Sequence, residues 1–147
     1  MKSASKYLKN AYLNLLDGAI TYNGSAVPVY DKESDPTGND YFIVVSTIND
    51  VDLANKSAFF SGTQVTIDVI TRVPNTMLRV SDAVDSITEK ILQLVLPSNH
   101  TTGLADDSDF HVKLVRKDSM NDFPLSDSGT KKIVRRIIKF SQTVKEK

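Results

Sequence analysis

Apolar residues recur along the chain with two different periods, and these periods predict its secondary structure. Near the N-terminus, apolar residues of SASKYLKNAYLNLLDG form a single stripe at helical spacing, which predicts an amphipathic helix that ends before Gly18. Helical spacing returns in NTMLRVSDAVDSITEKILQLVLP. This segment predicts a second helix that is capped by Asn75, stops at Pro97 and extends over about 30 Å.

Three segments between and after these helices have the pattern of β-strands. Residues Thr63–Arg72 and Asp109–Lys117 alternate apolar and polar positions, which is typical of strands with one face on a core. Residues Asp40–Ile48 are β-branched and aromatic without clean alternation, which predicts a strand that is covered at least partly on both faces. We expect Pro74 to end the strand at Thr63–Arg72.

Turn residues define the short segment after the first helix. Asn23-Gly24 favours a two-residue hairpin, because both residues accept positive φ angles, and short strands are expected on either side of it. Pro28 cannot donate a hydrogen bond to a strand ladder. The strand that follows is therefore expected to be irregular or to lie at the edge of a sheet.

The last segment, TKKIVRRIIKFSQTV, allows two interpretations. Its apolar pairs recur four residues apart, which is helical spacing, whereas its β-branched content and the preceding SDSG turn favour a strand. We predict a strand. The order of elements then predicts an α+β fold, with a mostly antiparallel sheet of about five to six strands and two helices packed on it.

Composition points to one domain over residues 1–147 without covalent staples. The chain has no cysteine, so disulfides and thiolate metal sites are excluded. We expect no signal peptide and no membrane span, and therefore folding in a cytosol. Residues 131–147 hold seven Lys/Arg and one Glu, a net charge of +6, which the rest of the chain balances. This asymmetry indicates either that unlike surfaces meet or that a basic tail is solvated.

Candidate sites for chemistry do not meet the requirements of a catalytic or metal centre. The acidic stretch that begins at Asp31 has Pro36 and Phe42 where a calcium loop needs Gly and Glu, so we interpret it as a solvated connection between strands. The carboxylates in ADDSDF have no phosphate-cradling glycine loop beside them, and His100 and His111 lack metal-ligand spacing. We predict no enzyme activity and no cofactor.

Two loops and the basic segment are the candidate interaction sites. The predicted loops at residues 49–62 and 118–129 exceed ordinary hairpin length and contain apolar residues, which either tuck under the loop or meet a partner. In the basic segment, cations lie on both faces of the predicted strand, so at least one face should meet solvent, DNA or acidic groups of a neighbouring subunit. The candidate interface residues are Phe59, Phe60, Phe123, Leu125, Lys131, Lys132, Arg135, Arg136 and Lys139.

The order of these features resembles the tail terminator, or tail-completion, proteins of tailed bacteriophages. A helix ending in LNLLDGAI precedes VPVYDKESDP and DYFIVV, the strand SGTQVTIDVITR runs straight into the helix MLRVSDAVDSITEKILQLV, and two strands follow. The resemblance implies a ring of identical subunits, hexameric or dodecameric, between the head-side connector and the tail. It also implies a location in the virion, assembly in the host cytoplasm, and possible passage of genomic DNA through the ring.

A second function remains open at this point. Five cations lie within nine residues of the basic segment, and a small nucleic-acid-binding module would use them to contact phosphates. The segment has one aromatic residue, Phe140, which gives little support for base stacking.

Overall fold

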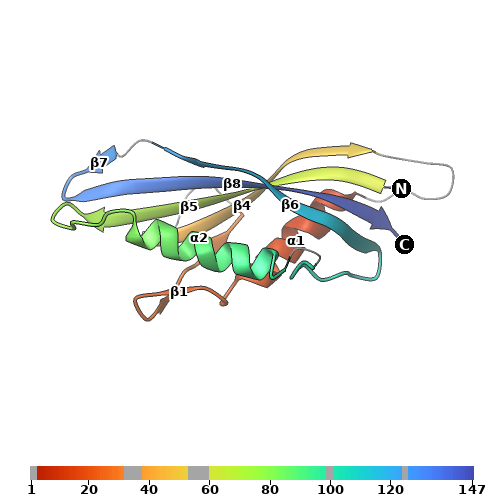
Figure 1. Ribbon diagram of the computed structural model, residues 1–147, viewed down its shortest axis with the longest axis horizontal. Coiled ribbons are helices and arrows are strands. Elements are labelled where there is room, and N and C mark those ends of the chain that lie inside the picture. The colour runs from red at the N-terminus through yellow and green to blue at the C-terminus, as the bar shows by residue number, and fades with distance from the viewer. Residues whose placement is uncertain (1–2, 32–37, 53–59, 99–100, 124–125) are drawn as a thin grey trace.

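The protein is a two-layered α+β domain with a six-stranded sheet on one side and two helices on the other (Figure 1). A computed structural model describes residues 3–31, 38–52, 60–98, 101–123 and 126–147. The helices are α1 (Ala4–Leu16) and α2 (Asp82–Val95). The strands are β1 (Thr21–Tyr22), β2 (Ser25–Ala26), β3 (Val29–Tyr30), β4 (Tyr41–Asp52), β5 (Phe60–Pro74), β6 (Phe110–Asp122), β7 (Ser126–Ser128) and β8 (Lys131–Glu146).

The topology of the large sheet confirms the predicted fold class. Its strand order is β3-β4-β5-β8-β6, and β7 pairs with the first residues of β8. Every pairing is antiparallel except that of β3 with β4. Both helices pack on the same side of this sheet, which we call the helix-covered face (Figure 1). We call the opposite side the outer face.

The first helix and the hairpin follow the sequence prediction. In α1, Leu8, Tyr12 and Leu16 are fully buried against the sheet, and Gly18 takes a φ of 73° just past the helix end. Asn23 and Gly24 have φ angles of 52° and 78°, which place them in the left-handed region that a tight hairpin turn requires. After Pro28, β3 pairs only with β4, so the prediction of an edge strand is also confirmed.

The second helix has Ser81 at its N-cap position, six residues later than the predicted cap Asn75. Asn75 does not cap a helix, because its backbone N–H donates to the Thr130 carbonyl at 3.0 Å and its side-chain Nδ2 donates to the Gly129 carbonyl at 3.1 Å. These hydrogen bonds hold residues after β5 against the turn before β8. The helix starts at Asp82, and its 14 residues extend over about 21 Å rather than 30 Å. Leu78, within the predicted helix, is 99% exposed.

The strands extend further than the predicted ones, and the two predicted loops are correspondingly shorter. β4 continues to Asp52 and β5 begins at Phe60, so both ends of the predicted loop at 49–62, residues 49–52 and 60–62, belong to strands. Likewise, β6 continues to Asp122 within the predicted loop at 118–129. Polar residues continue the strands here because ladder partners on β5 and β8 satisfy backbone groups of β4 and β6.

The final segment is a strand, as predicted, and it organises the sheet. β8 pairs with β5 from Lys131 opposite Pro74 to Lys145 opposite Phe60. Its alternate side chains on the helix-covered face are buried with those of β5 in the core. Because the side-chain period of a strand is two, the residues between them project from the outer face.

A polar cluster is buried beneath the helices at one end of this core. The Tyr12 hydroxyl donates to Gln142 Oε1 at 2.7 Å, and Gln142 Nε2 donates to Thr63 Oγ1 at 2.7 Å. Burial raises the pKa of Tyr12 above its usual range, so the hydroxyl stays protonated and able to donate. The three side chains connect α1, β8 and β5, and both the Tyr12 hydroxyl and Gln142 Nε2 have a hydrogen-bond acceptor.

Candidate interaction surface

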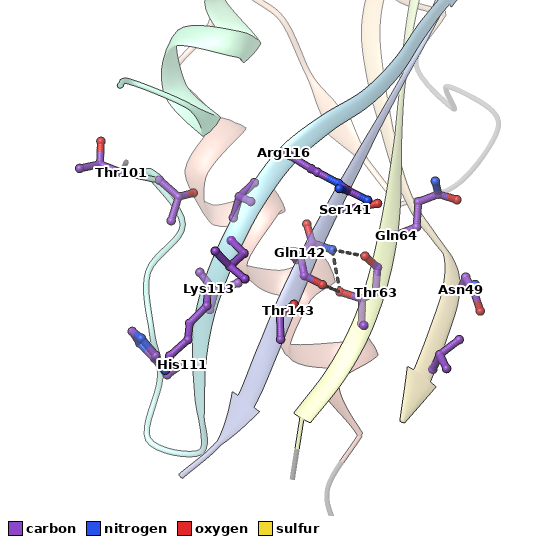
Figure 2. Close-up of a pocket in the computed structure, with 16 residues that line it drawn as sticks. Asn49, Thr63, Gln64, Thr101, His111, Lys113, Arg116, Ser141, Gln142 and Thr143 are labelled. Carbon is purple, nitrogen blue, oxygen red and sulfur yellow. Dashed lines mark hydrogen bonds between the residues drawn. The ribbon is translucent and has the colours of Figure 1, made fainter. Parts of the chain in front are cut away.

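The outer face has a groove at the end of the sheet where the described chain begins and ends. Its volume is about 1160 Å³. In Figure 2, Asn49 of β4 stands on one side of the groove, His111 and Lys113 of β6 stand on the other, and Ser141 and Thr143 of β8 lie between them. Four strands thus contribute polar or basic side chains to one concave surface.

Strand register explains why these residues share the groove. Lys113 pairs with Thr143, which pairs with Gly62, and Gly62 pairs with Val51. The neighbouring row across the sheet consists of Asn49, Gln64, Ser141 and Arg116. Residues that pair across antiparallel strands point to the same face, so each row presents its side chains together on the outer face.

A hydrogen-bond network around Asp118 crosses the groove. Arg116 Nε donates to Asp118 Oδ1 at 3.0 Å, Gln64 Nε2 donates to Oδ2 at 3.2 Å, and the Ser141 hydroxyl also donates to Oδ2. The hydrogen bond from Ser141, followed by those from Gln64 and Arg116, holds the pKa of Asp118 below its usual range, against the effect of burial. The carboxylate therefore stays charged near neutral pH.

The edge strand β6 is irregular where it borders the groove. Its register with β8 shifts between Lys113 and Arg116, which marks a β-bulge. Within the bulge, Leu114 has a φ of 51° and is 81% exposed. A leucine in the left-handed region is unusual, and the bulge turns its apolar side chain into solvent at the groove rim.

Three of the five candidate cations on β8 form ion pairs within the described part of the chain. Lys131 Nζ lies 2.6 Å from Asp40 Oδ1. Arg135 Nε lies 2.9 and 2.8 Å from the two carboxylate oxygens of Asp68, and its guanidinium carbon is 4.9 Å from the Phe123 ring centroid. These contacts occupy the outer face at the end of the sheet near β7.

Arg136 projects to the other face and is the third paired cation. Its guanidinium Nη1 lies 2.8 Å from Asp85 Oδ1 of α2, and its Nε lies 2.5 Å from Asp122 Oδ1 of β6. The side chain is only 12% exposed. The hydrogen bond to Asp122 is the main cause that raises the pKa of Arg136. Arg136 therefore joins the helix layer to the sheet as part of the folded subunit.

The remaining two candidate cations lie on opposite faces. Lys132 pairs with the buried Val73 and so points to the helix-covered side, where it is half-buried. Lys139 pairs with Thr66 and Ser119 on the outer face. Of the five predicted cations, Lys139 is the one that lies beside the groove.

The aromatic candidates lie on or beside strands. Phe60 is the first residue of β5 and is half-buried, and the Lys145 ammonium lies 5.9 Å from its ring centroid. Phe123 directly follows β6, and its backbone N–H donates to the Arg135 carbonyl at 2.9 Å. Phe60 therefore lies in a strand and not, as expected, in a loop. Phe59 and Leu125 lie outside the described residues.

The acidic and histidine candidates do not assemble a metal centre among the described residues. His111 Nδ1 lies 2.6 Å from Asp106 Oδ2, and Asp107 Oδ1 accepts the backbone N–H groups of Asp109 and Phe110 at 2.7 Å. In the described ranges, no group of three or more histidine or acidic residues is arranged to hold a metal ion. Asp31 and Asp40 border the acidic stretch, but its central part and His100 are not described.

Sequence reasoning missed the groove residues Lys113 and Arg116, and also Lys145, which lies beyond Thr143 on the same face of β8. Lys113 lies in a predicted strand at a position that alternates with Phe110 and Val112, so its outward direction could have been expected. Sequence alone did not predict that these three residues share one end of the outer face, because this arrangement depends on the pairing of β6 with the end of β8.

Comparison with known proteins assigns no family to the chain. A scan against protein-family models and a search of curated proteins returned no match. Among the described helices, neither is long and apolar enough to cross a membrane.

Proposed function

We propose that the protein is a structural subunit of a phage virion, which assembles into a homo-oligomeric ring at the head–tail junction or the head-proximal end of the tail. In this role it joins the connector to the tail proteins and performs no catalysis. The ring is hexameric or dodecameric, and genomic DNA passes through it. The order of elements that resembles tail terminator proteins supports this proposal, and the α+β sheet agrees with it.

The observation that carries the proposal is the pair of incomplete sheet edges. Among the described residues, β3 covers β4 only at Ile43 and Val44, so residues 46–52 of β4 pair on one side only. At the opposite edge, β6 pairs with β8 alone. Unpaired strand edges favour association with another chain, because their backbone groups seek hydrogen-bond partners.

The two edges differ, so contact between them is head to tail. A β4 edge of one copy against a β6 edge of the next uses two unlike surfaces. Contacts of this kind close into a ring when the rotation between copies allows it. The exposed Val51 and Leu114 lie on these two edges and mark the surfaces that would approach each other.

Cross-linking tests the head-to-tail arrangement directly, since the natural chain has no cysteine. The variants Val51→Cys and Leu114→Cys are prepared separately, mixed, and treated with a flexible bifunctional thiol reagent in solution and in assembled particles. We expect the mixture to give cross-linked dimers, the double variant to give a ladder that ends at the ring size, and each single variant alone to stay monomeric on a denaturing gel.

Light scattering and negative-stain imaging supply the matching size measurement. A closed ring in the particle, or in solution when the connector is present, is the expected result. A single monomeric copy in the assembled particle contradicts the ring. Dimers from one single-cysteine variant alone indicate a symmetric contact and contradict the head-to-tail arrangement.

A further inference from the structure

Three lysines on the outer face have no ion-pair partner within 4.0 Å among the described residues. They are Lys113, Lys139 and Lys145, whereas Lys131 and Arg135 on the same face are paired. Strand register places Lys139 opposite Ser119 of β6 and Thr66 of β5, neither of which is acidic. Unlike the paired cations, these lysines have charges that the described part of the subunit leaves uncompensated.

Uncharged donors fill the space between these lysines. Asn49, Gln64, Ser141 and Thr143 line the same groove as Lys113 and Arg116 (Figure 2). Lysine and arginine together with Ser, Thr, Asn and Gln side chains are the groups that contact phosphate oxygens in protein–DNA interfaces. The surface therefore combines long-range attraction for a polyanion with neutral donors that can position it.

The Asp118 carboxylate, around which the groove network is built, is already occupied. Asp118 accepts hydrogen bonds from Arg116, Gln64 and Ser141, so its charge is partly neutralised inside the subunit. Four cations, Lys113, Lys139, Lys145 and Arg116, stand against Asp118 and against Asp106, which lies 2.6 Å from the groove residue His111, so these side chains carry a formal charge of +2. A polyanion is the chemical class of partner that this balance attracts.

The protein's own acidic residues are poorly placed to serve as that polyanion in a second copy. Many carboxylates of the described chain are already engaged within it, namely Asp40, Asp68, Asp85, Asp106, Asp107 and Asp122. A second copy would have to break these contacts to neutralise the groove. Charge complementarity therefore favours an external polyanion over self-association through this face.

The dimensions and the aromatic content distinguish duplex from single-stranded nucleic acid. Lys139 and Lys145 are six residues apart on β8, about 20 Å along the strand, and β4 to β6 spans about 14 Å across the sheet. About 20 Å of duplex axis carries roughly twelve phosphate charges. Single-strand platforms stack bases on several aromatic rings, whereas Phe60 is the one aromatic residue described at this end of the outer face, and Lys145 lies over it.

We propose that the outer-face groove binds the phosphate backbone of duplex DNA without reading its base sequence, through Lys113 and Arg116 in the groove and through Lys139 and Lys145 on either side of it along β8. This inference goes beyond the ring proposal and does not rest on it, since the groove lies within one subunit. In a ring whose outer faces line the channel, the same residues would contact the passing DNA.

Fluorescence anisotropy with a labelled duplex of about 20 base pairs tests the proposal. With four phosphate contacts, the plot of log affinity against log salt should have a slope of about −3 to −4. The triple variant Lys113→Gln/Lys139→Gln/Lys145→Gln keeps most of each side-chain stem but removes the charge. We expect it to lose at least about tenfold in affinity near 0.1 M salt and to reduce the slope by about 3.

A matched control separates the groove from the net charge of the chain. The variant Lys6→Gln/Lys9→Gln/Lys117→Gln removes the same charge from α1 and from a β6 position that pairs with the core residue Phe140. Its affinity should stay within about twofold of the natural protein. Thermal unfolding of both triple variants checks that each remains folded.

A gain-of-binding variant tests the site without removing any lysine. Asp118→Asn preserves a hydrogen-bond acceptor for Arg116 and Ser141 but deletes the one negative charge of the groove network. We expect its affinity for duplex DNA to rise a few-fold, with a steeper salt dependence. Unchanged affinity would show that DNA does not approach Asp118 and would overturn the assignment.

Three further results would also overturn the proposal. These are no duplex binding at 50 mM salt, equal losses in the two triple variants, and tighter binding of a single strand of the same length. If the groove variant instead abolishes a salt-sensitive self-association, the face is a contact between copies. DNA binding by a protein that forms no ring would contradict the ring proposal alone.

Discussion

Both faces of β8 carry apolar and basic residues, but these residues have different surroundings and roles on each face. On the helix-covered face, Val134 and Ile138 are buried, and Arg136 between them reaches carboxylates on α2 and β6. On the outer face, Ile137 is half-buried and Lys139 has no carboxylate partner among the described residues. The role of each residue is therefore set by the face to which strand alternation directs it.

The outer face is itself divided along its length. Near β7, Phe42, Val44 and Asp68 are buried, and Arg135 binds Asp68. Near the ends of the chain, the same face becomes the polar and basic groove (Figure 2). One half of the outer face thus contributes to stability, and the other half exposes charges that we assign to binding.

The largest difference between the two faces is expected for neighbouring isoleucines. Ile138→Ala should lower the free energy of unfolding by about 3 kcal/mol, because it removes buried methylenes and leaves a cavity. Ile137→Ala on the half-buried outer side should cost about 1 kcal/mol or less. Urea denaturation of both variants measures the difference. Equal losses would show that the outer face is as well packed as the core.

The buried polar cluster should give the next largest effect. Gln142→Leu leaves the Tyr12 hydroxyl buried without its acceptor, at a cost of about 2 kcal/mol. The double variant Tyr12→Phe/Gln142→Leu removes both polar partners and should be less destabilised than Gln142→Leu alone. Chemical denaturation of the two variants tests this ordering. A double variant that is the less stable of the two would mean that packing, rather than hydrogen bonding, dominates at this position.

For the two neighbouring arginines, the outer-face residue should contribute more to stability, which is the reverse of the order expected for the isoleucines. Arg135→Met deprives Asp68 of its partner, and because the Asp68 side chain is only 12% exposed, we expect a loss of about 1.5 kcal/mol. Arg136→Met frees Asp85 and Asp122, which are more than half exposed and can be hydrated, so about 1 kcal/mol is expected. Thermal unfolding at neutral pH compares them, and adding Asp68→Asn to Arg135→Met should recover part of the loss.

The smallest expected effect is an acid-dependent loss of stability that involves both faces. Hydrogen bonds from Ser141 lower the pKa of Asp118 on the outer face, and those from Arg136 lower the pKa of Asp122 on the other. A lowered native pKa adds stability that is fully present above the unfolded value near 3.9 and is lost as the pH falls through the native value. The free energy of unfolding should therefore be flat from pH 7 to 5 and decline below about pH 4.

Single substitutions apportion this acid dependence between the faces. Asp118→Asn and Asp122→Asn should each flatten part of the decline when urea midpoints are measured from pH 7 to 2.5. Because water reaches both carboxylates, whose side chains are 23% and 60% exposed, each contribution is expected to be small. An unchanged acid profile in both variants would assign the decline to other carboxylates.

Sequence patterns predicted the fold class and most elements because local physics determines them. The apolar stripe of α1, the Asn23-Gly24 turn and the β-branched composition of the last strand each state a local preference that the structure keeps. The errors fall where local signals compete with distant partners. Asn75 has the chemistry of a helix cap, yet it binds the backbone of Gly129 and Thr130, which lie more than fifty residues away.

The candidate site could be predicted only in part. Lys139 and Phe60 were named from sequence, whereas Lys113, Arg116 and Lys145 were not. The charge count identified a basic segment, but it could not show which of the cations form ion pairs. Three of them turned out to be paired with carboxylates that lie far away in the sequence.

By itself, the sequence determined which residues share a face of each element, since side-chain periods of 2 and 3.6 residues are properties of the local backbone. Tertiary structure alone decided which cations are neutralised and where the strands end. Both depend on strand register, and a shift by one residue would exchange the buried and exposed sets of β8. The outer-face groove exists because long-range pairing brings four strands together, and the pattern of each strand read separately does not contain that information.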